Sequence, residues 1–445
     1  MRQGDGRWNR STLGAEGRCS GEAPIVVRAP LQARPSSMTR EIRRLLVVAS
    51  VFPNAEQPVF GTFVAERVRA YARQVEVAVV APVPWFPRGI PRAPAPWARA
   101  ARIPRWETID GVPVHHPRRI VIPRVGGVAS GALYAACLRR MLPRLREHFP
   151  YDAVDSHFAW PDGCGVVRAM AGSGVPVAIT LQGTDITWMP RYPVERACIR
   201  SAIRRADSVI AVSRSLADAA ARLSSGAVCP TVVWPGVDPE RFPAVEREAA
   251  RARLGLPREV RIIACVAHFV PRKRQRMLLA AFRDLRKAPE FRDVHLLLIG
   301  DGPDRAPILT DVRRAGEAAC VHLPGAVDHR RVHEWLGAAD VFALASTREG
   351  CPTVIREAMA CGLPVVATDV DGSGEVIDDP RLGCLVPRDD LPELVRALRW
   401  ALRSSWDRGL LRRRAIEWTW DHVAGRTLEV IAAAQRVPAR MGRCG

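Results

Sequence analysis

The sequence predicts an α/β protein built from two doubly wound domains, each with a mostly parallel sheet between layers of helices. Short runs of Val, Ile, Ala and Leu alternate with longer amphipathic stretches, which is typical of βαβ units. The apolar runs show no polar alternation, which indicates strands that are buried on both faces. The chain has 445 residues, too many for one hydrophobic core, so two domains are expected.

Residues 1–40 form the first segment, and we expect them to be a disordered tail because they lack apolar periodicity and are rich in Gly, Ser, Arg and Pro. Residues 41–235 are expected to form an N-terminal, acceptor-side Rossmann-like domain. Its predicted strands span 45–50, 75–81, 153–156, 177–181 and 208–212, and its predicted helices span 60–72, 131–148 and 193–205.

A second domain follows the Pro- and Gly-containing linker 233–239, which breaks regular structure. We expect residues 236–420 to form a second Rossmann-like domain that binds the ligand at the carboxyl ends of its strands. Residues 421–445 are expected to form a helix that crosses back to the first domain, and a tail. The predicted strands are 262–266, 295–299, 321–323, 341–345 and 365–368, with helices at 276–285 and 352–361.

The formal net charge of +20 attracts anions such as nucleic acid, an acidic membrane surface or phosphorylated substrates. No nucleic-acid-binding motif accompanies the charge, so no nucleic-acid partner is expected. The eleven cysteines are odd in number and contain no Cys-x-x-Cys pair, which predicts reduced thiols in the cytoplasm rather than disulfides or zinc. No apolar run approaches the ~18 residues of a membrane span, and no secretory signal is apparent.

Residues 85–106 interrupt the first domain with arginines, prolines and tryptophans and no acidic residue. Arginine mixed with tryptophan suits an anionic membrane interface. A flexible surface insertion is the equally weighted alternative. The first reading places the protein peripherally on the inner face of the cell membrane.

The most informative stretch is residues 346–368, which directly follows a predicted strand. Glu349 and Glu357 are eight residues apart, one in a loop and one in the following helix, so both can point into one cleft. A carboxylate accepts two hydroxyl hydrogens at once, which suits the adjacent hydroxyls of a ribose or hexose. Gly350 permits close approach of a ligand. Pro352 suits the first position of a helix, whose N-terminus attracts anions.

This stretch closely resembles the donor-site motif of the retaining GT-B glycosyltransferases of family four, in which two glutamates are separated by seven residues. The resemblance extends over about residues 42–435 and implies the GT-B fold. It implies that Glu357 binds the donor ribose and Glu349 the transferred sugar. The loop residues that it implies to hold sugar and phosphate are Gly350, Cys351, Pro352 and Thr353.

The segment 267–274 resembles the pyrophosphate clamp of the same family, in which Lys273 matches the family lysine. His268 stands where arginine is frequent, and Arg272 or Arg274 could compensate. In the first domain, Gly61 matches a loop that faces the donor phosphates. His157 matches a histidine near the transferred sugar and acceptor, with a strand-end histidine bonded to backbone as the alternative.

The segment 181–185 resembles a His-Gly-Ser/Thr-Asp turn in which Gln182 replaces the histidine, so this position cannot act as an acid or base. Asp185 is expected either to bind the acceptor or to cap the next helix. The resemblance implies retention by front-face attack, with Lys273 and the helix N-terminus stabilising the leaving diphosphate. It also implies no metal and no other cofactor, and we identify no Asp-x-Asp motif that would hold a metal in a sugar-nucleotide site.

The expected activity is hexosyl transfer from a nucleotide-sugar donor to a glycan or lipid-linked oligosaccharide acceptor. The first-domain motifs look most like those of bacterial surface-polysaccharide transferases. Two alternatives remain: a nucleotide-sugar epimerase, which needs an acid/base pair and no acceptor surface, and a catalytically inactive nucleotide-sugar-binding homologue.

Overall fold

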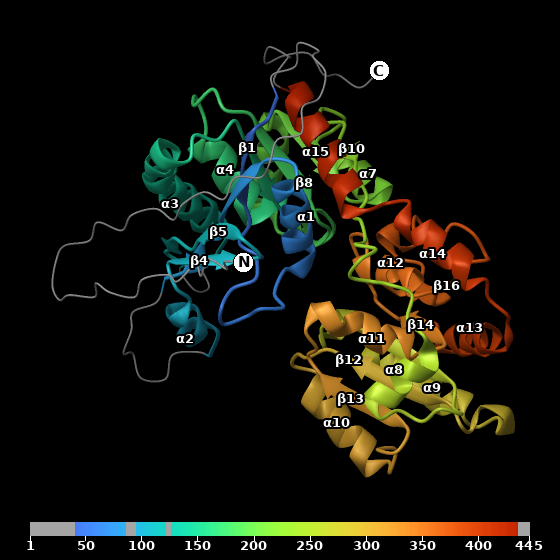
Figure 1. Ribbon diagram of the computed structural model, residues 1–445. Helices are drawn as coiled ribbons and strands as arrows, with labels where there is room; N and C mark the ends of the chain where they lie inside the picture. Colours follow the sequence, from blue (N-terminus) through green and yellow to red (C-terminus); the bar gives the residue numbers. More distant parts are fainter. Residues whose placement is uncertain (1–40, 86–94, 122–125, 435–445) are drawn as a thin grey trace, which may run out of the picture.

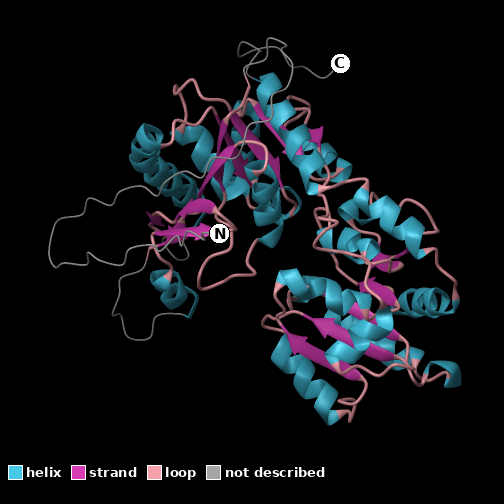
Figure 2. Cartoon of the chain, viewed as in Figure 1, coloured by secondary structure: helices cyan, strands magenta, loops and turns pink. Residues whose placement is uncertain are grey.

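The computed structural model describes residues 41–85, 95–121 and 126–434, and it confirms the predicted class of two parallel-sheet α/β domains (Figure 1). The predicted tails 1–40 and 435–445 lie outside the described residues. Helices cover both faces of each sheet (Figure 2). Every strand and helix predicted above is present, and the largest displacement is at α3, which begins at Gly126.

The first sheet has eight strands in the order β10-β9-β8-β7-β1-β2-β5-β4, and all pairs are parallel except β4 with β5. Alternate residues of β1 show why its apolar run is continuous: Leu46 and Val48 enter one core, and Leu45 and Val47 enter the core on the opposite face. The strands are β1 (Arg44–Val48), β2 (Glu76–Val80), β4 (Trp106–Ile109), β5 (Val112–His115), β7 (Ala153–His157), β8 (Val177–Leu181), β9 (Ser208–Ala211) and β10 (Thr231–Val232).

The helices of this domain lie on both faces of the sheet, and a separate two-stranded ladder joins β3 (Val83–Pro84) to β6 (Arg118–Arg119). The helices are α1 (Thr62–Ala72), α2 (Ala95–Arg102), α3 (Gly126–His148), α4 (Cys164–Ala169), α5 (Thr184–Thr187), α6 (Pro193–Arg205) and α7 (Arg214–Leu223).

The edge hairpin β4–β5 corrects the expected insertion at residues 85–106. Asp110 and Gly111 connect the strands with φ of 48° and 81°, the conformation of a two-residue hairpin turn. Trp106 begins β4, and its ring stacks on His115 with centroids 3.9 Å apart. Trp106 is therefore part of the sheet rather than of a free loop. Residues 86–94, which the insertion also included, lie outside the described residues.

The second sheet has six parallel strands in the order β13-β12-β11-β14-β15-β16 around a single large core. Its strands are β11 (Ile262–Val266), β12 (His295–Ile299), β13 (Val321–Gly325), β14 (Val341–Leu344), β15 (Val365–Thr368) and β16 (Gly383–Val386). Its helices are α8 (Arg247–Leu254), α9 (Gln275–Leu285), α10 (Arg305–Arg314), α11 (Val332–Gly337), α12 (Thr353–Ala360), α13 (Leu391–Arg403) and α14 (Arg408–Ile416).

The helix α15 (Trp420–Ala434) leaves the second domain and packs against α1 of the first (Figure 1). Val423 and Ile431 belong to the same buried cluster as Val68 and Tyr71. The Arg73 Nε also donates to the Asp421 carboxylate over 2.6 Å. The first domain is therefore completed by residues from the far end of the described chain.

Candidate active site

Two glycine-containing loops bring the domains into backbone contact. Gly183 follows β8 of the first sheet, and Gly350 follows β14 of the second. A Cβ added to Gly350 would lie 2.0 Å from the Gln182 carbonyl oxygen, and one added to Gly183, whose φ is 134°, would lie 2.9 Å from the Gly350 Cα. Gly350 was expected to allow close approach of a ligand, but its Cα lies against the backbone of the opposite domain. Three predicted site residues are linked to this contact at the carboxyl ends of the strands: Asp185 and His157 contact Gln182, and Lys273 contacts Glu349.

A second contact between the domains involves the Glu375 carboxylate. It accepts hydrogen bonds from the backbone N–H groups of Arg214 and Ser215 over 2.7 and 3.0 Å, and from the Trp234 indole over 2.7 Å. The first turn of α7 leaves N–H groups without helical partners and carries a partial positive charge, so it favours a carboxylate. Glu375 thus connects the second domain to the first domain and to the linker.

Glu349 and Lys273 form an ion pair at the centre of the site. The Glu349 carboxylate is buried, and its Oε1 accepts a hydrogen bond from the Lys273 Nζ. The Arg272 guanidinium approaches the other carboxylate oxygen at 3.7 Å. The backbone N–H of Glu349 donates to Asp371 over 2.9 Å, which holds the loop. The predicted sugar ligand and phosphate ligand therefore lie together.

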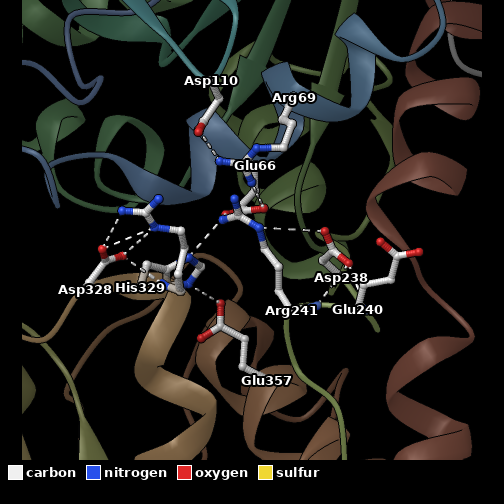
Figure 3. A network of polar contacts seen from close by, with 10 residues as sticks. Glu66, Arg69, Asp110, Asp238, Glu240, Arg241, Asp328, His329 and Glu357 are labelled. Atoms are coloured by element: carbon white, nitrogen blue, oxygen red, sulfur yellow. Dashed lines mark hydrogen bonds and ion pairs between the residues drawn. The ribbon is translucent and has the colours of Figure 1, made fainter. Parts of the chain in front are cut away.

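Glu357 is also buried, but it is held by a different cation. The His329 ring lies between the domains (Figure 3), with Nε2 3.1 Å from Glu357 Oε1 and Nδ1 3.2 Å from Glu66 Oε1 of α1. Burial opposes protonation of His329, yet the two carboxylates raise its pKa to about 10. Burial likewise opposes ionisation of Glu66, but His329 and Arg69 lower its pKa to about 2. His329 is therefore a cation that joins α1 to the predicted ribose ligand.

We expect a His329→Gln substitution to change the pH dependence of stability. Because the folded pKa of His329 is raised, its contribution is complete below the unfolded value of 6.5 and is lost as the pH rises through about 10. Glu66 stays ionised across this range. The midpoint of thermal unfolding of the wild type should exceed that of the variant at pH 6, and the difference should shrink towards pH 10. Each kcal/mol corresponds to roughly 2–4 °C.

The matched control is His148→Gln, because the His148 ring is exposed and contacts the Arg144 carbonyl. This variant removes a contact with a backbone carbonyl and none with a carboxylate, so its midpoint should stay close to that of the wild type. If the His329→Gln difference were constant from pH 6 to pH 10, the ionic role of His329 would be refuted.

The start of α12 corrects one residue assignment. Pro352 is the N-cap residue, with ψ of 103°, and the helix begins at Thr353 rather than at Pro352. Burial raises the pKa of the Cys351 thiol to about 12, so this side chain is neutral beside the loop. The first turn of α12 begins three residues after Gly350, and the role of this loop in holding the donor stays a prediction.

His157 is fully buried, and both of its ring nitrogens face protein side chains. Its Nδ1 lies 2.8 Å from the Gln182 amide nitrogen, and its Nε2 lies 3.2 Å from the Asp155 carboxylate. Asp155 in turn accepts hydrogen bonds from Tyr71 and Thr180. His157 thus ends a buried polar chain, and its partners are side chains rather than the backbone groups of the alternative reading. Its expected position near the transferred sugar and acceptor stays a prediction.

The Asp185 carboxylate is bound by backbone groups, and its expected acceptor role stays a prediction. Its side chain is 1% exposed, and its carboxylate accepts three backbone hydrogen bonds: from Ala159 over 2.7 Å, from Gly183 over 2.8 Å and from Gln182 over 3.2 Å. Gly183, rather than Asp185, is the N-cap residue of α5. Asp185 therefore holds the Gln182–Gly183 turn in place, which positions the backbone that meets Gly350.

Gly61 and His268 also have local structural roles. Gly61 adopts a φ of 74° before α1, and a Cβ there would lie 2.5 Å from the Val51 carbonyl oxygen, so the close approach is to its own domain. His268 is exposed, and its carbonyl accepts a hydrogen bond from Gln275. Of the two arginines considered as its substitutes, Arg272 faces Glu349 whereas Arg274 pairs with Asp389.

Sequence reasoning missed His329, Glu66 and Arg241. The Arg241 Nη1 donates over 2.8 Å to Glu66 Oε1, the same oxygen that His329 Nδ1 contacts (Figure 3). A signal existed for His329, since it follows shortly after the predicted strand 321–323, at the ligand-binding end of the sheet. No comparable signal existed for Glu66, which lies inside an amphipathic helix.

The comparisons with known proteins agree with this architecture. Residues 260–404 match the family described as Glycosyl transferases group 1, and residues 60–241 match Glycosyltransferase Family 4. The chain is 31% identical over 360 residues to the alpha-maltose-1-phosphate synthase of Mycolicibacterium smegmatis, covering 72% of this chain and 87% of that protein. It is 29% identical over 340 residues to TuaC of Bacillus subtilis, named as a teichuronic acid biosynthesis glycosyltransferase, covering 74% and 82%.

A solved structure shares the fold. The HepE protein of Anabaena in complex with UDP aligns with a TM-score of 0.65 at 19% identity, covering 88% of this chain and all of that one. Two facing Rossmann-like domains with the site at their contact define the GT-B class of glycosyltransferases. The chain belongs to the family 4 type within this class.

Two further observations concern metals and membranes. Among the described residues, no group of three or more His, Cys, Asp or Glu side chains is arranged to hold a metal ion. Within the same parts of the chain, no helix combines the length and apolar character that a membrane span requires.

Proposed function

We propose that the protein is a retaining hexosyltransferase that moves a sugar from a nucleotide-sugar donor to a glycan or lipid-linked oligosaccharide in surface polysaccharide biosynthesis. One observation carries the donor assignment: two buried glutamates lie near the strand ends of the second domain, and each contacts a different cation. Glu349 contacts Lys273, and Glu357 contacts His329. Lys273 and the first turn of α12 are the groups suited to stabilise a leaving diphosphate.

Front-face transfer with retention is the mechanism that these residues support best. A covalent intermediate needs a free carboxylate as nucleophile. Of the candidates, Glu349 is paired with Lys273, and Asp185 is saturated by three backbone amides. The departing diphosphate would then accept the proton of the acceptor hydroxyl. Contact between the domains excludes water, the competing acceptor. Under this proposal the reaction needs no metal.

The relatives support the substrate classes. TuaC carries teichuronic acid biosynthesis in its name, and HepE was solved with UDP and with UDP-glucose. The decisive experiment incubates the purified protein with UDP-, GDP- and ADP-sugars, with and without EDTA, and follows slow hydrolysis by mass spectrometry. One donor should be consumed in both conditions. An isomerised donor would indicate an epimerase, and binding without turnover would indicate an inactive homologue.

We further propose that the protein acts in the cytoplasm while held peripherally on the anionic inner face of the membrane. Trp85 and Ile120 are 49% and 55% exposed and directly follow the paired strands β3 and β6. The net charge of +20 adds attraction to anionic lipid.

We expect binding to phosphatidylglycerol vesicles to fall steeply as salt is raised, because exposed charges are screened within ~8 Å at physiological ionic strength. Co-sedimentation at increasing salt measures this. Phosphatidylcholine vesicles are the control, and equal binding to them would contradict an electrostatic attachment.

A further inference from the structure

Two arginines from opposite domains meet over one exposed tryptophan beside the site. Trp188 follows α5, and its side chain is 38% exposed. The Arg191 Cζ lies 3.4 Å from the centroid of the Trp188 ring, and the Arg348 Cζ lies 4.1 Å from it. Tyr192, 46% exposed, lies 5.6 Å from the same Arg191 carbon. A guanidinium over an indole face is favourable, so Trp188 orients both cations.

These two guanidiniums lack anionic partners within the described parts of the chain. Neither Arg191 nor Arg348 makes a side-chain hydrogen bond or an ion pair there. The neighbouring cations differ, because Lys273 and Arg272 both face the Glu349 carboxylate. Burial lowers the pKa of Arg348, and the positive charge of Arg272 lowers it further, whereas the charges of Asp371 and Glu349 oppose this shift. Two cations held over one ring, with no carboxylate in contact among the described residues, favour the binding of an anion, since like charges repel in a partly buried place.

The position of this pair is on the acceptor side of the site. Arg348 immediately precedes Glu349, the proposed ligand of the transferred sugar, and Trp188 lies one turn beyond the Gln182–Gly183 backbone that meets Gly350. The acceptor must approach the transferred sugar from the first domain. A ligand that reached Arg191 and Arg348 together would touch both domains beside Glu349.

We propose that Arg191 and Arg348 bind an anionic group of the acceptor, a carboxylate or a phosphate attached to a sugar. A planar guanidinium matches either group with paired hydrogen bonds. The exposed rings of Trp188 and Tyr192 offer flat apolar surface to the sugar that carries the charge. The inference rests on the proposed transferase function and gives its acceptor a chemical class.

The test measures binding of glucuronate, glucose 6-phosphate and glucose by calorimetry. The protein is saturated with the nucleoside diphosphate, UDP, GDP or ADP, that the wild type binds. Hydrogen bonds to a charged group should make at least one anionic sugar bind roughly tenfold or more tightly than glucose. Preference for glucuronate would indicate a carboxylate on the acceptor, and preference for glucose 6-phosphate would indicate a phosphate.

The variant Arg191→Ala/Arg348→Ala should remove this preference, and Arg191→Gln alone should reduce it. The matched control is Arg204→Ala/Arg205→Ala, which loses the same charge from two exposed arginines at the end of α6. The control should keep the preference of the wild type, which separates local binding from net charge.

Three results would overturn the inference: equal binding of all three sugars to the wild type, an equal loss in the control variant, or a tenfold loss of nucleoside diphosphate affinity in Arg191→Ala/Arg348→Ala. The last would assign the arginines to the donor phosphates. Failure of the proposed function itself would look different, because the wild type would then consume no nucleotide sugar at all.

Discussion

A Lys273→Met variant is expected to turn over its donor roughly 10²–10³-fold more slowly than the wild type, the loss typical of removing one preorganised electrostatic group. The Lys273 ammonium contacts the Glu349 carboxylate in the site, and the lysine side chain is 12% exposed. Its removal takes a positive charge from the leaving diphosphate and leaves Glu349 with Arg272 at 3.7 Å as its remaining cation. Donor consumption at saturating donor measures the effect.

The chain supplies an unusually clean control. The sequence contains two lysines, Lys273 and Lys287, among 66 basic residues. Lys287 lies on the surface and pairs with Asp284, so Lys287→Met should retain full turnover. A compact ammonium and a planar guanidinium are not equivalent, so Lys273→Arg should also lose activity. Wild-type turnover in Lys273→Met would eliminate the proposed role.

Glu357→Gln and Glu349→Gln are expected to have different effects, because one residue is assigned to the ribose and the other to the sugar. Hydrogen bonds to a charged group contribute about 1.5–3 kcal/mol, so Glu357→Gln should weaken nucleoside diphosphate and intact donor alike by roughly ten- to a hundredfold. Glu349→Gln should leave nucleoside diphosphate affinity nearly unchanged and reduce turnover, because its contact matters as the sugar departs. Calorimetry and turnover on both variants decide it.

His329 makes a further control necessary. Because His329 contacts Glu357, the loss in Glu357→Gln could arise through the histidine rather than through the ribose. His329→Gln removes that contact but keeps the carboxylate, so it should bind the nucleoside diphosphate at least as tightly as the wild type. Equal losses in Glu357→Gln and Glu349→Gln, or in neither, would show that the assignment is wrong.

The fold was predictable because its signals are local and repeated. Continuous apolar runs such as 177–181 identify strands buried on both faces, and their alternation with helices identifies βαβ units and a parallel sheet. The β4–β5 hairpin was missed although its Asp110-Gly111 pair is a strong turn signal. The predicted insertion ended at Trp106, where β4 begins.

The site was only partly predictable, for a physical reason. Glu349, Glu357 and Lys273 stand in a recognisable local pattern. The partner that holds Glu357, however, is His329, and its other contact is Glu66, 263 positions earlier in the chain. Such a contact exists only once the domains are placed together. Asp185 is the opposite case, since it stands in a recognisable motif. Its carboxylate nevertheless accepts hydrogen bonds from backbone N–H groups, and the spacing of residues in the sequence does not predict these contacts.

The packing of α15 on α1 has a consequence for how the protein is made. Trp420, Val423 and Ile431 cover Val68 and Tyr71, which emerge from the ribosome some 350 residues earlier. Synthesis at about 5–20 residues per second separates the completion of β9 from that of α15 by on the order of 10–40 s. During this interval the part of the α1 surface that α15 will cover has no cover from its own chain. The first domain of the nascent chain should therefore bind holdase chaperones until α15 emerges, and ribosome-bound chains should show when that occupancy ends.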